Sequence, residues 1–297
     1  MNANFAAMRY PEPEVWLRIV GEELGLRYAQ YFLDLCEPTW PDEIRRRIVA
    51  ETLHWAREYG VQIPTLFSGA IAHRYNLFLH PDEDVRLYFV QWYRRMLDTA
   101  AEIGCEAAGS YLGSFSLRDW NDVKRREYVL SHALDLYREL THYAQERGLK
   151  YLMLEPMSTP REYPSTMREA EELYARVNEG AAIPVKACLD VGHGRVHTGE
   201  PEDADPYAWL RRFGAISPIV HIQQTDKSSS KHWPFTPKTN AQGVIEADKV
   251  LEALQASGAA ETLLVLELDY PAFEPFDDQM LDDLHASVRY WRQYIKD

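Results

Sequence analysis

The feature that most constrains this chain is a repeated alternation of short apolar runs with longer amphipathic stretches. A short apolar run is typical of a strand that is buried on both faces of a parallel sheet, and the longer stretches have the spacing of helices that cover such a sheet. Eight strand–helix alternations in succession favour an α/β fold of the (β/α)8 or TIM-barrel type over an open doubly wound sheet. The predicted strands lie within Ala3–Arg9, Arg27–Leu33, Val61–Ser68, Glu106–Ser110, Tyr151–Glu155, Val185–Asp190, Ile219–Gln223 and Leu263–Leu268.

Length and composition agree with one large barrel. The chain has 297 residues, of which 46% are hydrophobic, and we expect residues 1–297 to form a single TIM-barrel domain. The net charge of −14 argues against a surface for nucleic acid or anionic membranes. Three widely spaced cysteines, Cys36, Cys105 and Cys188, suggest neither a disulfide framework nor a CxxC zinc site. This cysteine usage suits a reducing environment, so we expect a cytoplasmic protein, and no stretch resembles a membrane span.

Four consecutive predicted strands end in a residue that can bind a metal. They are Glu155, Asp190, His221 and Glu267. The carboxyl ends of the strands of a TIM barrel surround one mouth, where active sites lie. Carboxylates are costly to bury alone, and a shared divalent cation would neutralise them. Each residue by itself could merely cap a strand or helix, but the set of four predicts a site for Mn²⁺ or Mg²⁺, with Co²⁺ or Zn²⁺ as alternatives.

Further candidates for substrate binding follow these strands. His193 lies three residues after Asp190 in a glycine-flanked turn, and His73 follows the third predicted strand. Each could instead be a loop histidine bonded to the backbone. The loop after the seventh strand gathers hydroxyl and basic groups in an otherwise acidic chain, and loops at this place in TIM barrels often bind phosphate. A solvated loop would have the same composition. The candidates in this loop are Lys227, Ser228, Ser229, Ser230, Lys231 and His232.

At these motifs the chain resembles the xylose isomerase-like TIM-barrel superfamily, and within it the branch of sugar phosphate isomerases/epimerases and ketose 3-epimerases. The resemblance spans nearly the whole chain and rests on the order Glu155, Asp190-x-x-His193, His221-x-x-x-x-Asp226 and Glu267. It implies that Glu155, Asp190, His221 and Glu267 bind one divalent metal, that the two glutamates are the catalytic acid/base pair, and that His193 binds substrate. It also suggests a homodimer or homotetramer.

Two departures from the family's pattern bear on the substrate. Arg161 stands where ketose epimerases often carry a further glutamate, and Lys227 stands where an arginine is frequent. Together with the Ser/Lys-rich loop, they favour a small ketose that carries a phosphate, such as a tetrulose or pentulose phosphate, with Arg161 assisting the loop. The sequence therefore predicts an isomerase, either an epimerase or an aldose–ketose isomerase, that moves a proton through an enediolate.

Three other functions are compatible with parts of this pattern. A metal-dependent polyol dehydratase of the same superfamily and a non-catalytic module that binds metal and sugar both remain open alternatives. An abasic-site DNA endonuclease shares the fold but needs a histidine-rich mouth and a basic DNA-binding face. The fourth predicted strand, Glu106–Ser110, has no histidine and the chain is acidic, so this function is discounted.

Overall fold

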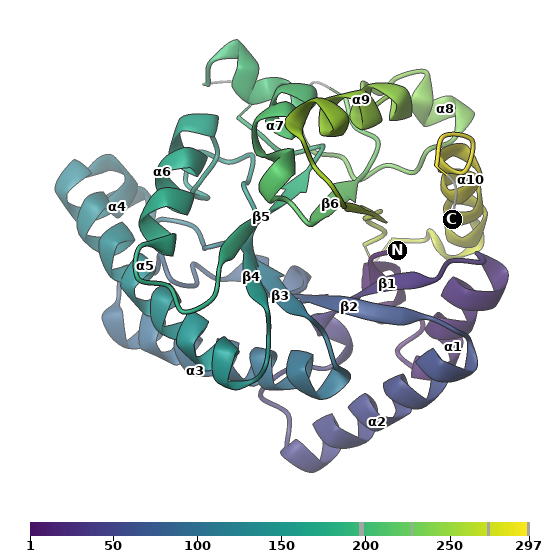
Figure 1. Ribbon diagram of the computed structural model, residues 1–297, viewed down its shortest axis with the longest axis horizontal. Helices are drawn as coiled ribbons and strands as arrows, with labels where there is room; N and C mark the ends of the chain where they lie inside the picture. Colours follow the sequence, from purple (N-terminus) through teal and green to yellow (C-terminus); the bar gives the residue numbers. More distant parts are fainter. Residues whose placement is uncertain (196–198, 227, 272–273, 296–297) are drawn as a thin grey trace.

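The computed structural model describes residues 1–195, 199–226, 228–271 and 274–295, and its strands form one curved parallel sheet. Neighbours in sequence are neighbours in the sheet, in the order β1-β2-β3-β4-β5-β6-β7. Helices ring this sheet in Figure 1, as in a barrel. The strands are β1 (Tyr28–Phe32), β2 (Gln62–Phe67), β3 (Ala107–Ser110), β4 (Tyr151–Leu154), β5 (Val185–Asp190), β6 (Ile219–Ile222) and β7 (Leu263–Leu266).

Two of the helices between the strands end at a glycine. Gly104 ends α3 (Glu83–Ile103) and Gly258 ends α9 (Ala247–Ser257) in the left-handed conformation, which glycine adopts without steric cost. The first helix, α1 (Pro13–Arg18), continues into a π-helical turn, Ile19–Glu23. The helices are α1 (Pro13–Arg18), α2 (Asp42–Glu58), α3 (Glu83–Ile103), α4 (Leu117–Asn121), α5 (Val123–Glu146), α6 (Met167–Asn178), α7 (Pro206–Phe213), α8 (Pro237–Asn240), α9 (Ala247–Ser257) and α10 (Asp277–Trp291).

The first predicted strand, Ala3–Arg9, is wrong. Ala3–Ala6 forms a 3-10 helix, whose first turn is capped by the side chain of Asn2. The eighth position of the barrel is filled by Asn2, which makes a parallel bridge to Gln30. Its backbone N–H donates to the carbonyl of Leu266 in β7 at 2.8 Å. Asn2 therefore pairs with β1 on one side and with β7 on the other, and this single residue closes the barrel.

The barrel interior is filled by a layer of inward-facing side chains. This layer comprises Phe67, Ala107, Met153, Cys188, Ile219 and Val265, one each from β2 to β7. Because side chains alternate between the two faces of a strand, the residues two positions later point into the barrel as well, one layer nearer its mouth. In the last four strands these are Glu155, Asp190, His221 and Glu267. The strand register therefore sets the four predicted ligands directly above an apolar floor.

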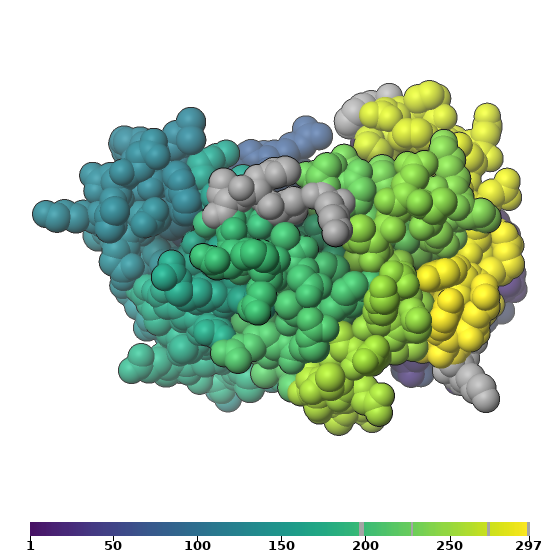
Figure 2. Space-filling view, turned by 90° about the horizontal axis from the view of Figure 1, so that it is seen from above, coloured from purple at the N-terminus to yellow at the C-terminus, as the bar shows by residue number. Residues whose placement is uncertain are grey.

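The outline of the molecule is a squat body with one projecting end. Figure 2 shows the region of α4 and the start of α5 standing out as a lobe at the left, the same end that carries α4 in Figure 1. Among the described residues, no helix combines the length and apolar character that a membrane crossing requires.

Candidate metal centre

Four side chains from four successive strands converge at the mouth of the barrel. The ligand atoms of Glu155, Asp190, His221 and Glu267 all lie within 4.8 Å of one another, and all four residues are buried. The imidazole Nδ1 of His221 lies 3.1 Å from Glu155 Oε1 and 3.1 Å from Glu267 Oε2. The structure thus brings together the whole predicted ligand set at the spacing that a single ion requires.

A chain of hydrogen bonds defines which nitrogen of His221 faces the carboxylates. Asn2 Nδ2 donates to Glu267 Oε1 at 2.7 Å and to Gln30 Oε1 at 3.0 Å. Since Gln30 Oε1 is an acceptor, His221 Nε2, at 2.8 Å from it, is the donor. Burial disfavours protonation of His221, but Cys188, Glu267 and Glu155 raise its pKa well above its usual range, so in the metal-free protein Nδ1–H faces the two glutamates as a cation. A divalent cation could take the place of this proton, and the Nδ1 of the neutral ring would then offer its lone pair to the ion.

The electrostatics of the two glutamates differ although both are buried. Burial raises the pKa of Glu155, and the neighbouring His221 only partly offsets this. Burial acts on Glu267 in the same direction, but His221 together with His232 and His193 holds the pKa of Glu267 well below its usual range. The two carboxylates are therefore in unlike environments, which is the condition for unlike roles in acid–base chemistry.

Asp190 is oriented by an amide that the sequence analysis did not single out. Gln223 Nε2 donates to both carboxylate oxygens of Asp190, at 2.8 and 3.0 Å, and the backbone N–H of Gly192 donates to Oδ1 at 2.5 Å. Gln223 Oε1 in turn accepts from the backbone N–H of His232 at 2.5 Å. Gln223 Nε2 also lies 2.8 Å from Ser230 Oγ, so Gln223 connects the candidate ligand Asp190 to the loop after β6.

The predicted histidines of the mouth lie around this cluster. His193 Nδ1 is 3.5 Å from Glu155 Oε1 and 3.1 Å from the carbonyl oxygen of Pro156. Its ring meets that of His232 edge to face at 5.8 Å. His73 stacks on Tyr111 with ring centroids 4.2 Å apart, and burial, followed by the charge of His193, lowers its pKa to about 4. His73, His193 and His232 therefore share one side of the mouth.

The remaining residues of the predicted phosphate loop point in different directions. Ser228 and Ser229 are exposed; the Ser228 hydroxyl donates to Asp226 Oδ1 at 2.5 Å, and the Ser229 carbonyl accepts from Thr225. Lys231 Nζ lies 5.9 Å from the centre of the Trp233 ring. The structure thus connects Ser230 and His232 through Gln223 to the four candidate metal ligands, whereas Ser228 and Ser229 bond within their own loop. Lys227 lies outside the described residues.

Arg161 lies at the rim between two neighbouring loops. Its guanidinium donates to the carbonyl of Phe115 at 2.6 Å and to Ser114 Oγ at 3.2 Å. Ser114 and Phe115 follow β3, and Arg161 follows β4, so this residue ties together the segments that leave the carboxyl ends of these strands. The guanidinium is only half-buried and has further donors to offer a ligand.

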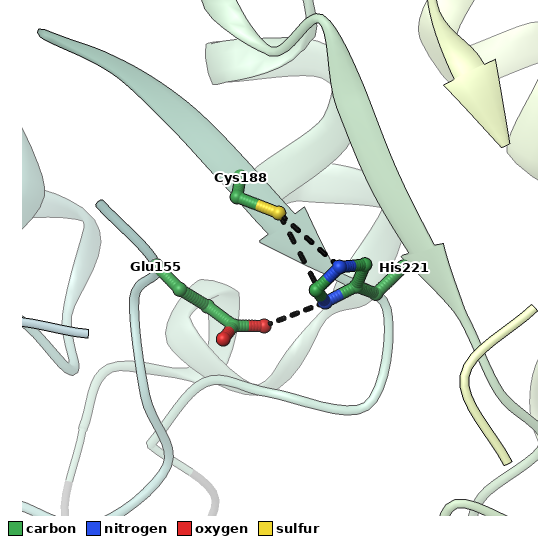
Figure 3. A group of neighbouring side chains, drawn as sticks. All are labelled: Glu155, Cys188 and His221. Carbon is green, nitrogen blue, oxygen red and sulfur yellow. Dashed lines mark hydrogen bonds and ion pairs between the residues drawn. The ribbon is translucent and has the colours of Figure 1, made fainter. Parts of the chain in front are cut away.

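Cys188 is a further side chain of the cluster that the motifs did not indicate. It is fully buried, and its Sγ lies 3.5 Å from His221 Nε2 and 3.9 Å from Nδ1 (Figure 3). Burial raises the pKa of its thiol to about 12. The available signal was its position two residues before Asp190 on β5, which places both side chains on the inward face. Gln30 and Asn2 had no comparable signal, because a buried amide in an apolar run is equally consistent with core packing.

The chain has extensive similarity to known proteins. The family model of the xylose isomerase-like TIM barrel matches residues 21–294. D-erythrulose 1-phosphate 3-epimerase of Brucella abortus (strain 2308) is 33% identical over 296 residues, which cover 99% of this chain and 95% of that protein.

Solved structures give the same result. A protein of Rhodospirillum rubrum described as a candidate xylose isomerase superposes with a TM-score of 0.92 at 31% identity, covering 100% of this chain and 98% of that one. D-psicose 3-epimerase of Clostridium cellulolyticum H10 has a TM-score of 0.72 at 16% identity, with 96% and 94% covered, and shares the fold. These similarities confirm the predicted barrel fold and the predicted class of enzyme, an isomerase. The chain belongs to the xylose isomerase-like TIM-barrel family.

Proposed function

We propose that this chain is a divalent-metal-dependent 3-epimerase of a short ketose phosphate, with a tetrulose 1-phosphate as the first substrate to test. The observation that carries the proposal is the convergence of Glu155, Asp190, His221 and Glu267, with a glutamate on either side of the imidazole Nδ1. The similarity to a D-erythrulose 1-phosphate 3-epimerase over nearly the full length of both chains supports the substrate class.

The donor set fits one hard divalent cation. Three carboxylates and one imidazole suit Mn²⁺ or Mg²⁺, and the same set accepts Co²⁺ or Zn²⁺. When bound, the cation would supply Lewis-acid stabilisation of the negative charge that develops as a proton leaves the carbon beside the ketose carbonyl. Gln30 and Gln223 would hold His221 and Asp190 in place, as outer hydrogen-bond partners of metal ligands commonly do.

Glu155 and Glu267 would act as the base and the acid that transfer the substrate's C3 proton. They come from β4 and β7, on two sides of the mouth, and the apolar floor beneath them restricts water. For epimerisation at carbon 3, one glutamate removes the C3 proton from one face of the substrate and the other returns a proton to the opposite face. Inversion requires two groups placed in this way, whereas aldose–ketose isomerisation requires delivery to the neighbouring carbon.

The other polar residues of the mouth would orient the substrate. His193 and His73 lie beside the carboxylates and offer ring nitrogens to hydroxyl groups of the substrate. The loop after β6, with Lys227, Ser228, Ser229, Ser230, Lys231 and His232, would receive the phosphate, and Arg161 would assist from the loop after β4. A basic loop in an acidic protein is a place where such an anion is favoured.

The test is incubation of the purified protein with erythrulose 1-phosphate in D₂O, with and without Mn²⁺. We expect deuterium at C3 and formation of the C3 epimer, both dependent on the metal. Free erythrulose is the matched substrate without phosphate and should react much more slowly. Loss of water from the substrate would indicate a dehydratase, and binding without exchange of any C–H proton would indicate a sugar-binding module. Either result would contradict the proposal.

A further inference from the structure

Gln223 is a fully buried amide that lies between the candidate metal centre and the loop after β6. Its Nε2 donates to both carboxylate oxygens of Asp190, and its Oε1 accepts from the backbone N–H groups of Lys231 at 3.2 Å and His232 at 2.5 Å. A carboxylate only accepts hydrogen bonds and a backbone N–H only donates, so these partners fix which end of the amide faces which side. One planar group therefore joins a candidate metal ligand to the loop.

The neighbouring chain leaves this amide little freedom to move. A Cβ at Gly192, in the turn that follows Asp190, would lie only 2.4 Å from Gln223 Cδ, so the amide packs directly against that turn. On the loop side, Ser230 Oγ lies 2.8 Å from Gln223 Nε2 and 3.2 Å from Oε1. A displacement of Asp190 therefore displaces Gln223, and with it the backbone of the loop.

The backbone of His232 is the part of the loop that this amide holds. Its φ of 49° lies in the left-handed region, which is uncommon for a residue with a Cβ. The conformation is held from both sides, because the N–H donates to Gln223 Oε1 and the carbonyl accepts from the N–H of Asp269 at 3.1 Å. A strained residue persists only while its surroundings hold it. The backbone at His232 is thus a two-state element that responds to the position of the Gln223 amide.

We propose that Gln223 is a positioning residue that couples metal binding at the centre to anion binding by the loop after β6, an inference that rests on the proposed function. An ion that fixes Asp190 also fixes the amide, and the amide fixes the backbone of residues 230–232, so a phosphate meets a loop that is already ordered. An anion on the loop acts in the reverse direction and favours the arrangement of Asp190 that binds the ion. Such coupling is reciprocal, so each ligand raises the affinity for the other by the same factor.

The first test measures this coupling with Mn²⁺ and methyl phosphate, which carries the anion of a sugar phosphate without its hydroxyl groups or carbonyl. Saturating methyl phosphate should raise the Mn²⁺ affinity of the wild-type protein by at least about fivefold, the lower end of the usual coupling between two sites. Gln223→Met has a side chain of similar size without either polar contact, and it should reduce this factor to about one. Gln30→Met, which removes the support of His221 instead, is the matched control: it should weaken Mn²⁺ binding but keep the factor.

A second measurement uses the wild-type protein alone, so it does not depend on how the variants fold. Mg²⁺ should slow hydrogen exchange at the backbone amides of Lys231 and His232 by a similar factor, whereas the amide of Val250, bonded within α9, should change little.

Three results would overturn the proposal. They are a wild-type coupling factor of about one, a factor that persists in Gln223→Met because the anion acts on the ion directly, and unchanged exchange at His232 with Mg²⁺ bound. None of these readouts involves turnover. Tight metal binding without coupling would therefore contradict only this inference, whereas a protein that bound no divalent metal would contradict the proposed function as well.

Discussion

The two halves of the barrel mouth differ in chemistry. The ends of strands β4 to β7 bring the three carboxylates and the imidazole of the candidate metal centre to the mouth, whereas β1 to β3 contribute neutral groups at the same level. Gln30 on β1 binds His221 across the barrel, and Gly109 on β3 accommodates the Phe67 ring, from which a Cβ at this position would lie only 2.7 Å. One half carries the charged groups, and the other holds them in place through neutral contacts.

This difference indicates how the site is stabilised. Buried carboxylates without a cation are destabilising, so the charged half depends on what it binds. The neutral half is satisfied internally: Asn2 donates to Gln30 and Glu267, and Gln30 Nε2 lies 3.3 Å from Thr65 Oγ1. The neutral half can therefore keep the ligands in position before an ion arrives. Substitutions in each half would test this division of roles.

The largest effect is expected in the charged half. Replacing Glu155 or Glu267 with glutamine preserves the shape and one ligand oxygen but removes the base. Turnover should fall by about 10²–10⁴-fold, the usual contribution of a positioned acid or base. Metal content must be measured in the same samples, so that loss of the ion is not mistaken for loss of the base. Glu106→Gln, at the opposite end of the barrel where Glu106 pairs with Lys150, is the matched control.

Turnover like that of the wild type in both metal-loaded variants would remove the two glutamates from the chemistry. A further signature concerns the proton itself. If a single glutamate acted on both faces, some deuterium would pass from C3 of labelled substrate to C3 of the product. With Glu155 and Glu267 on opposite faces, the inverted carbon should instead acquire its hydrogen from solvent.

The next effect tests the neutral half. Gln30→Met removes the acceptor for His221 Nε2–H at similar volume, so the ring is free to present either nitrogen to the carboxylates. Mn²⁺ affinity should decrease by about 10–100-fold, as is typical when the partner of a ligating histidine is lost. Gln30→Glu keeps an acceptor and should retain binding. Thr65→Val, which removes the contact of Gln30 Nε2 and leaves the Oε1 acceptor in place, is the control. Equal Mn²⁺ affinity in Gln30→Met and the wild type would show that the ring needs no such partner.

The residues of the charged half could be predicted from the sequence, whereas those of the neutral half could not. The sequence indicates the four candidate ligands because a charged or ligating residue at the end of an apolar strand is seldom needed for packing alone. Four such residues at equivalent positions of successive strands are harder still to explain by packing. They are Glu155, Asp190, His221 and Glu267. Gln30, Gln223 and Asn2 could not be recognised, because their roles depend on contacts across the barrel that no local pattern encodes. Cys188 could have been found from its two-residue offset from Asp190.

The fold was predictable to a similar extent. The alternation located β1 to β7, because apolar runs and glycine stops are local signals, whereas the short helices α4 and α8 were not predicted. The predicted strand Ala3–Arg9 failed because barrel closure is a tertiary requirement: Asn2 alone pairs with both neighbours, and the following residues turn into a 3-10 helix. The apolar character of Ala3–Ala6 reflects the burial of Ala3, Phe5 and Ala6 in a 3-10 helix and not a strand.

A smaller effect should distinguish phosphate recognition from general substrate binding. Lys231→Ala removes a cation of the loop after β6 and should reduce kcat/KM for the phosphorylated tetrulose by about tenfold or more, since a hydrogen bond to a charged group contributes about 1.5–3 kcal/mol. The value for free tetrulose should change little. Lys238→Ala, in α8 beyond the loop, is the control, and Lys227→Ala is the parallel variant. Equal losses on both substrates would mean that the loop recognises something other than phosphate.

The smallest effect concerns His73, which follows β2 in the neutral half. Burial and the nearby His193 lower its pKa to about 4, so the folded protein holds this ring neutral where the unfolded chain, with an ordinary pKa near 6.5, begins to bind a proton. The unfolded state therefore binds more protons between these two values, and the contribution of His73 to stability is complete above about pH 6.5 and decreases as the pH falls toward 4. The slope is at most about 1.4 kcal/mol per pH unit. His73→Phe keeps the stack on Tyr111 and should flatten the pH dependence of the free energy of unfolding in this window, measured by urea denaturation. His142→Gln, at an exposed position on α5, should leave the slope unchanged. An identical slope in His73→Phe and the wild type would show that the ring titrates in the folded protein as it does in the unfolded chain.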